Sequence, residues 1–570
     1  MSVAHAAGQS AEALAGQAAT DAARRTSVIS EFLSHYYATN PVTATFTGVH
    51  DYDGRLPDWS LHGTRAEIQT LERLRRQLAL SDEAAPAATL RDDATALDAE
   101  LVRGYVDLRL GDLVGEHSRS SNPALWTGEA IFGVVSLMIR NFAPAEERLP
   151  SIRARLAAIP AFLESLRTES SLPFPTLWRD RAIRECGTAQ RLLADGLPVW
   201  HSALAGDASV QAASSAFAET EQWLGERNTD VPTTPAGNLD LLLLRGHQSL
   251  ETSRELLRRA EAAMEEAKAS LDESVARFPG GTWSAVQAAI AADHPTAQEY
   301  YASFERRWRE IHAAVSAANV VTWPDWPIRY VPIPEWARDH ASSLYWLFYR
   351  SPAPFDPYTM YEYVVTPVDA SMSPDVQRAR LSAWNHSQIT LNHVVHHGGL
   401  GHHVQNWHAI HRSSSRIGQV AAVDTASRIG MFCGGSMAEG WACYATGLAG
   451  ELGLLTPLER LSEQHTAVRL LARCIVDIRM HDGDWPFEQC VRFYETQVGM
   501  THDVATAEAT KNSMFPGTAL MYWLGTDAIQ TARTTLERRE GAGFSLKQFH
   551  DSLLSRGAIP APLAARILTA

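Results

Sequence analysis

Six histidines fall within sixteen residues of this 570-residue chain, in the stretch HVVHHGGLGHHVQNWH at 393–408. Neutral imidazole is the commonest metal ligand among protein side chains. The stretch has helical character, and the insert GGLG bulges or breaks a helix. An unbroken helix would place His396 and His402 on opposite faces, whereas a break lets them converge. The stretch therefore predicts a metal site built across a kink.

A carboxylate further along the chain is the candidate third ligand. A metal held by two histidines needs at least one more protein donor. Glu439 lies in SMAEGWACYATGL, an otherwise small and aromatic helical stretch. A lone carboxylate is costly to bury there without a cation or a metal. We expect one divalent ion, zinc first, although an imidazole-rich site also suits iron, copper or nickel.

Four ordered motifs resemble those of the domain-of-unknown-function 885 family, which is similar to helical zinc metallopeptidases of the thimet oligopeptidase and Taq carboxypeptidase type. The family pattern HEAxPGHHxQ matches HHGGLGHHVQ at 396–405, and EGWALYAE matches EGWACYAT at 439–446. The pattern PGQAxxYxxG matches PGTALMYWLG at 516–525. A further segment, RxxxD…H…W, matches Arg473, Asp477, His481 and Trp485. With similar chain ends, the resemblance covers nearly the whole sequence.

The resemblance implies a mainly α, two-lobed, metallopeptidase-like fold with a deep cleft. It implies zinc bound by His396, His402 and Glu439. It also implies that His481 and Tyr522 bind the substrate or stabilise the anion of the transition state, as donors beside a metal can. Arg473 and Asp477 are four residues apart on one helical stretch, so they are either a structural ion pair or support for the site.

The first motif departs from the family at its second residue. His397 replaces the glutamate that would accept a proton from metal-bound water, and such a base contributes roughly a hundred- to ten-thousand-fold in rate. Imidazole is a base near neutral pH, so His397 is either a replacement acid/base or a further ligand, and His403 is another possible ligand. Thr518 replaces a Gln, and Lys511 and Asn512 stand where Arg and Tyr are expected.

Retained ligands with altered neighbours indicate a diverged metal-dependent enzyme. We expect the ion to act as a Lewis acid on a carbonyl or carboxylate of a small amide, a peptide or a specialised metabolite. His397, His481 and Tyr522 would be catalytic, and Arg473 and Lys511 would bind a substrate carboxylate. Two alternatives stay open: a lyase, isomerase or decarboxylase on the same site, and an inactive metal-binding protein with a closed coordination sphere.

Amphipathic helices must position these residues. The 3.6-residue apolar period is clearest at 249–278 and recurs at 64–80, 89–111, 150–168, 181–204, 211–225, 297–318, 378–397, 436–451, 457–480, 486–497, 525–539 and 546–555. Prolines, aromatics and β-branched residues mark 319–368, which favours a small sheet near the active site. We divide the chain into a helical scaffold lobe, 1–318, and a metal-site lobe with the sheet, 319–570.

The composition favours a soluble globular protein, with 45 % apolar and 20 % charged residues. A net charge of -15 with scattered Lys and Arg argues against nucleic acid and anionic membranes as partners, and favours a small-molecule or peptide-like substrate. Five cysteines without a CxxC pair predict free thiols in a reducing cytosol. No leader pattern or long apolar run occurs, so we expect a cytoplasmic protein. The oligomeric state is not indicated.

Overall fold

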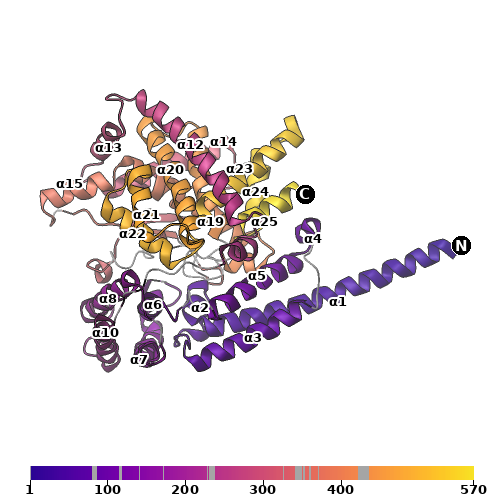
Figure 1. Ribbon diagram of the computed structural model, residues 1–570, viewed down its shortest axis with the longest axis horizontal. Coiled ribbons are helices and arrows are strands. Elements are labelled where there is room, and N and C mark those ends of the chain that lie inside the picture. Colours follow the sequence, from indigo (N-terminus) through magenta and orange to yellow (C-terminus); the bar gives the residue numbers. More distant parts are fainter. Residues whose placement is uncertain are drawn as a thin grey trace.

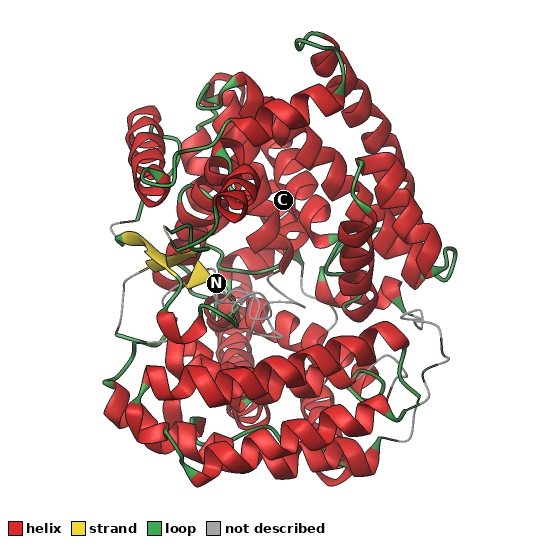
Figure 2. Cartoon of the chain, turned by 90° about the vertical axis from the view of Figure 1, so that its left-hand side faces the viewer, coloured by secondary structure: helices red, strands yellow, loops and turns green. Residues whose placement is uncertain are grey.

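The computed structural model is mainly helical and carries one small sheet (Figures 1 and 2). It describes residues 2–79, 86–114, 119–139, 141–170, 173–227, 229, 231, 238–324, 326–340, 349–350, 353–357, 361–369, 371–421 and 435–570. In Figure 1 the helices from α1 to α10 gather in one half of the molecule, and most of those from α12 to α25 gather in the other. The mainly helical fold class with a small sheet is confirmed.

The helices before the sheet are α1 (Ser2–Thr39), α2 (Pro41–Thr47), η1 (His50–Tyr52), α3 (Leu61–Ala79), α4 (Ala87–Asp92), α5 (Ala94–Val114), α6 (Pro123–Ile139), α7 (Ala145–Glu169), α8 (Thr176–Arg191), η2 (Leu192–Gly196), α9 (Leu197–Trp200), η3 (Ser202–Leu204), α10 (Ala208–Gly225), α11 (Leu239–Leu241), η4 (Leu242–Gly246), α12 (Ser253–Ala276), α13 (Trp283–Ala292) and α14 (Tyr300–Ala318). Those after residue 318 are η5 (Glu335–Ala337), α15 (Pro374–Ala383), α16 (His386–Gln388), η8 (Ile389–Gly398), α17 (His402–His411), α18 (Arg416–Val420), α19 (Gly435–Glu451), α20 (Pro457–His481), α21 (Phe487–Phe493), η10 (Tyr494–Val498), α22 (His502–Met514), α23 (Met521–Glu540), η11 (Gly541–Gly543), α24 (Leu546–Leu554) and α25 (Ala561–Thr569).

Every stretch with the expected helical period contains a helix, and local sequence explains where the clearest ones begin. Thr456 caps α20, because its hydroxyl oxygen accepts the Glu459 N–H while the Glu459 carboxylate accepts the Thr456 N–H. The period did not identify α6, whose residues are buried on nearly all sides. A helix that is apolar all round has no amphipathic stripe to detect.

The expected sheet lies within 319–368, with β1 (Ile328–Pro332), β2 (Tyr349–Arg350) and β3 (Tyr361–Val365) in the order β1-β3-β2. β1 is parallel to β3 and pairs Tyr330 with Tyr363, while β2 is antiparallel to β3. Both tyrosines reach the histidine segment: the Tyr330 hydroxyl donates to the His393 carbonyl at 3.2 Å, and the Tyr363 hydroxyl bonds His393 Nδ1. The sheet therefore lies against η8.

Packing crosses the proposed division at residue 319. Helix α12 lies along α20, and α14 packs on η8, so two helices of the first part support the second. Leu256, Leu257 and Met264 of α12 share one hydrophobic cluster with Leu471 and Ile475 of α20. A separate cluster joins α6, α7, α8 and α10. Helices from before and after residue 319 therefore both pack against the helices that carry the histidines. The division of the chain into two lobes at this residue stays a prediction.

A long-range histidine bridge ties the N-terminal half to the loop before β3. His50 bonds Asp53 at 2.9 Å and Asp356 at 2.8 Å. Burial lowers the pKa of His50, but these two hydrogen bonds and their charges outweigh it and raise the pKa to about 9. The imidazolium is thus favoured in the folded protein.

The structure describes four of the five cysteines. Cys186, Cys443, Cys474 and Cys490 are free thiols, whereas Cys433 lies outside the described residues. Among the residues that the structure describes, no helix combines the length and apolarity needed to cross a bilayer.

Candidate metal centre

The helix is interrupted at the glycines, as the sequence predicts. The π-helical segment η8 ends at Gly398, and α17 begins at His402 after a short turn. Gly401 N–H donates to the Val395 carbonyl at 2.8 Å, which folds the turn back on η8. A Cβ atom at Gly401 would lie 1.9 Å from the His396 carbonyl oxygen, so only glycine fits there. The turn brings His396 and His402 together.

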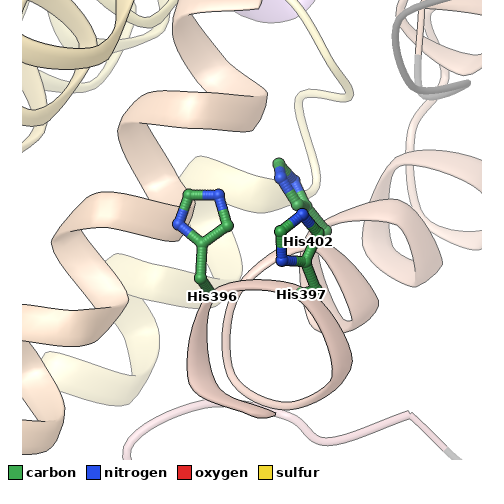
Figure 3. A group of neighbouring side chains, drawn as sticks. All are labelled: His396, His397 and His402. Carbon is green, nitrogen blue, oxygen red and sulfur yellow. The ribbon is translucent and has the colours of Figure 1, made fainter. Parts of the chain in front are cut away.

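Three imidazoles meet at this kink, as Figure 3 shows. The ring centroids of His396 and His402 are 4.8 Å apart, and that of His397 lies 4.7 Å from the first and 5.2 Å from the second. One nitrogen from each ring lies within 4.8 Å of the other two. The wider turn of a π-helix lets the adjacent residues His396 and His397 both face the centre.

Glu439 of α19 lies beside two of these three imidazoles. Its Oε2 lies 3.3 Å from His396 Nε2 and 3.7 Å from His402 Nε2. Tetrahedral zinc with bonds of about 2.0–2.1 Å holds its ligand atoms about 3.3–3.4 Å apart. The first distance equals this spacing and the second is somewhat longer, so the three side chains lie close enough to share one small divalent ion, and the donor set of imidazole and carboxylate fits zinc.

The neighbours of Glu439 in the segment EGWA hold α19 against the kink. Trp441 Nε1–H donates to the carbonyls of Leu400 at 2.9 Å and Gly401 at 3.2 Å. Gly440 faces Gly525 of α23, where a Cβ atom on Gly440 would lie 2.5 Å from the Gly525 backbone. The tryptophan therefore orients the turn, and the two glycines let α19 and α23 approach closely.

The histidines at the centre are neutral. Burial lowers the pKa of His396 and His397 to about 3 and holds the pKa of His402 well below its ordinary value. His397 Nδ1–H donates to the Asn392 carbonyl at 2.7 Å, so this tautomer carries its lone pair on Nε2. Neutral imidazole is the form that binds metals.

Two neighbouring histidines have structural contacts elsewhere. His403 Nε2 bonds the Trp326 carbonyl at 3.1 Å, which directs the ring toward the loop before β1. His393 stacks on Trp384 with centroids 4.3 Å apart and bonds Tyr363. The sequence suggested His397 and His403 as further metal ligands. His397 lies with His396 and His402, whereas His403 does not belong to this group of three.

A cavity of about 260 Å³ opens beside the cluster. It is lined by the expected residues His396, His397, Glu439, Arg473 and Tyr522. It is also lined by residues that were not singled out from the sequence, namely Gln388, Leu391, Asn392, Cys443, Thr446, Ser462, Glu463, Thr466, Arg469 and Leu470. Those on α20 recur at three- and four-residue spacing and therefore form one face of that helix.

The family model described as "Bacterial protein of unknown function (DUF885)" matches residues 41–568. The chain belongs to this family. No curated protein matches it. Two solved structures are similar over nearly all of their length: a "putative lipoprotein of unknown function from Shewanella oneidensis", with 19 % identity, a TM-score of 0.74 and coverage of 95 % of this chain and 98 % of that one, and "the putative lipoprotein from Colwellia psychrerythraea", with 17 % identity, a TM-score of 0.75 and coverage of 96 % and 98 %. They share the fold.

Arg473 and Asp477, of the segment RxxxD, do not form the local ion pair that their spacing allows. Arg473 does not pair with Asp477: its Nε and Nη2 donate to the two carboxylate oxygens of Glu508, each at 2.8 Å. Its guanidinium also lies 5.1 Å from the centroid of the Tyr522 ring. Asp477 accepts the backbone N–H groups of the turn before α23, at Gly517, Ala519 and Leu520. Arg473 thus reaches the cavity with its carboxylate partner already in place.

Two other expected site residues lie away from this cavity. His481 is buried, and its Nε2–H donates to the Asn512 carbonyl at 3.0 Å. Lys511 lines a separate groove of about 520 Å³ between α8 and α22. Thr518, which replaces the family Gln, donates to the Phe515 carbonyl at 2.7 Å. Neither His481 nor Lys511 is among the described residues that line the cavity at the histidine cluster.

Proposed function

We propose that this DUF885 protein is a metal-dependent enzyme whose divalent ion, zinc first, is held by His396, His402 and Glu439. The observation that supports this most is the approach of the Glu439 carboxylate to both imidazoles at distances suited to a tetrahedral ion. When bound, the ion would supply Lewis acidity toward a carbonyl or carboxylate oxygen of a small amide, peptide or specialised metabolite.

The cavity residues supply the remaining chemistry in this proposal. Tyr522, which lines the cavity together with Glu439, would donate its phenolic hydrogen to an anion that develops there. His397 offers Nε2 as an acid/base or as a further ligand, with its ring held by the Asn392 carbonyl. His481 and Lys511 are not given a role at the reacting atoms, because neither lines this cavity, although the charge of Glu439 acts on Lys511.

Peptide hydrolysis is not the favoured reaction within this class. His397 fills the position of the family glutamate, and its imidazole nitrogens occupy different points in space from a carboxylate oxygen. Hydrolysis of another amide is the nearest reaction, and a lyase, isomerase or decarboxylase reaction uses the same Lewis acid.

A metal-binding protein without turnover is the second candidate, and one observation favours it. The three imidazole nitrogens of His396, His397 and His402 lie together, and Glu439 contacts two of those residues. Four protein donors would close a tetrahedral sphere and leave no position for a substrate.

Element analysis and a His397→Glu variant test the proposal together. We expect about one divalent ion per purified chain, with turnover in a screen of amides, peptides and small carboxylic acids, and a change of preferred substrate toward peptides in the variant. His502→Gln is the matched control, because His502 is exposed and pairs with Glu495. Bound metal without turnover in either protein would favour the second candidate, and a protein that takes up no metal would overturn both.

A further inference from the structure

Arg469 is a cation in the cavity wall that the sequence motifs do not identify. It lies on α20, one helical turn before Arg473, and lines the cavity together with His396 and Glu439. Its charge acts on His396 and on Cys443, which also line that cavity. Arg469 therefore belongs to the environment of the candidate metal centre.

The guanidinium of Arg469 has no ion-pair partner among the residues that the structure describes. Its Nε is buried and has no hydrogen-bond partner there. Arg473, one turn later, contrasts with it, because its Nε and Nη2 both donate to the Glu508 carboxylate. Burial and, after it, the charge of Arg473 lower the pKa of Arg469, and the charge of Glu508 offsets this only in part. A buried cation without a direct ion-pair partner is costly, so its position requires an explanation.

No carboxylate that the structure describes pairs directly with Arg469, although the charge of Glu508 acts on it. Glu439 approaches the imidazoles and would be neutralised by a divalent ion. Glu508 is paired with Arg473. Burial raises the pKa of Glu463, the other acidic residue of the lining, which disfavours its charged form. With a metal bound, the cavity beside Arg469 carries an excess of positive charge, which suits an anionic ligand.

We propose that Arg469 binds a carboxylate of the substrate, so that the enzyme acts on carboxylate-bearing small molecules whose reacting carbonyl or second carboxylate faces the metal centre. This inference rests on the proposed function. The guanidinium fork matches a carboxylate with two parallel N–H···O bonds, which fixes the orientation of the ligand as well as its charge. Arg469 is thus a specificity residue, and it replaces Arg473 and Lys511 in the role that the sequence suggested for them.

A pair of metal-chelating probes isolates the contribution of Arg469. Acetohydroxamate chelates metal ions without a further charge, and succinic acid monohydroxamate carries an added carboxylate. Calorimetry on the zinc-loaded protein should show tighter binding of the second probe. In Arg469→Gln that preference should fall roughly ten- to a hundred-fold, while acetohydroxamate affinity and zinc content stay the same. Arg469→Lys keeps the charge and loses the guanidinium fork, so its preference for the carboxylate probe should lie between those of the wild type and Arg469→Gln.

Arg479→Gln is the matched control, because Arg479 lies on the same helix and pairs with Asp484 and Glu261 outside the cavity. It should keep the full preference. Equal binding of both probes to the wild-type protein, or an unchanged preference in Arg469→Gln, overturns the inference and leaves the metal centre intact. If the protein takes up no zinc, the proposed function fails. Carboxylate binding by Arg469 can then still be tested on the metal-free protein. N-benzoylglycine, but not N-benzoylglycinamide, should raise its thermal stability, and Arg469→Gln should abolish that effect.

Discussion

A methyl group at Gly401 should separate the two halves of the metal centre. Gly401 is the last residue of the turn between η8 and α17, and a Cβ atom on it would extend toward the His396 carbonyl oxygen. The change Gly401→Ala therefore adds an atom between the segments that carry His396 and His402, without altering any candidate ligand.

The required displacement follows from the backbone geometry. The new Cβ would lie 1.9 Å from a backbone oxygen, whereas real Cβ contacts are essentially never under 3.0 Å, so the two segments must move apart by at least 1.1 Å, the difference between these two values. A metal site tolerates about 0.2 Å in its bond lengths. We expect zinc affinity to fall at least roughly a hundred-fold, since changes in the residues that support metal ligands already cost about 10- to 100-fold.

Zinc affinity would be measured by competition with a chromophoric chelator, alongside circular dichroism to confirm that the helices are intact. Gly111→Ala in α5 is the matched control, because a Cβ atom there meets nothing within 4 Å and alanine is the better helix former. The control should bind zinc like the wild type. A folded Gly401→Ala variant with unchanged zinc affinity would refute the idea that the tight turn sets the position of the histidines.

Three further predictions concern the support of the site. The folded pKa of His50, about 9, exceeds its unfolded value of 6.5, so the stabilisation by at most about 3 kcal/mol is complete below pH 6.5 and disappears as the pH rises through 9. Chemical denaturation at several pH values should show this loss, and His50→Gln should remove it. Glu508→Gln leaves Arg473 without its carboxylate and should lower the free energy of unfolding by about 2–3 kcal/mol, which denaturant titration would measure; a change below about 0.5 kcal/mol would contradict the pairing. Trp441→Phe removes the N–H that holds the turn and should weaken zinc binding roughly ten-fold in the chelator assay, whereas an unaltered affinity would deny the indole this role.

The sequence predicts the helices and the kink because both have local causes. Apolar periodicity located many of the amphipathic helices but not α1, α13, α22 or α25. It also missed α6, which is apolar on every face. The GGLG insert predicted the turn at Gly401, since glycine tolerates a backbone oxygen where a Cβ would collide. The meeting of Glu439 with His396 and His402 was also expected, because a lone carboxylate in a small and aromatic helix is costly to bury without a metal and because the family resemblance implies the same three residues.

The contacts of individual polar side chains were harder to predict from the sequence, because they depend on which helices pack together. Spacing of four residues suggested that Arg473 pairs with Asp477, but α22 brings Glu508 to Arg473 and the turn before α23 brings backbone donors to Asp477. His481 points toward α22 and not into the cavity. Arg469 belongs to no motif, and only the cavity-facing side of α20 identifies it.

Zinc-edge anomalous diffraction from crystals grown with zinc tests the central claim most directly. We expect one strong peak within about 2.0–2.2 Å of His396 Nε2, His402 Nε2 and a carboxylate oxygen of Glu439. A fourth contact to His397 would favour the metal-binding alternative, and a remaining solvent position would favour the enzyme. The absence of any peak there, with Glu439 merely accepting a hydrogen bond from His396, would contradict the existence of the metal centre.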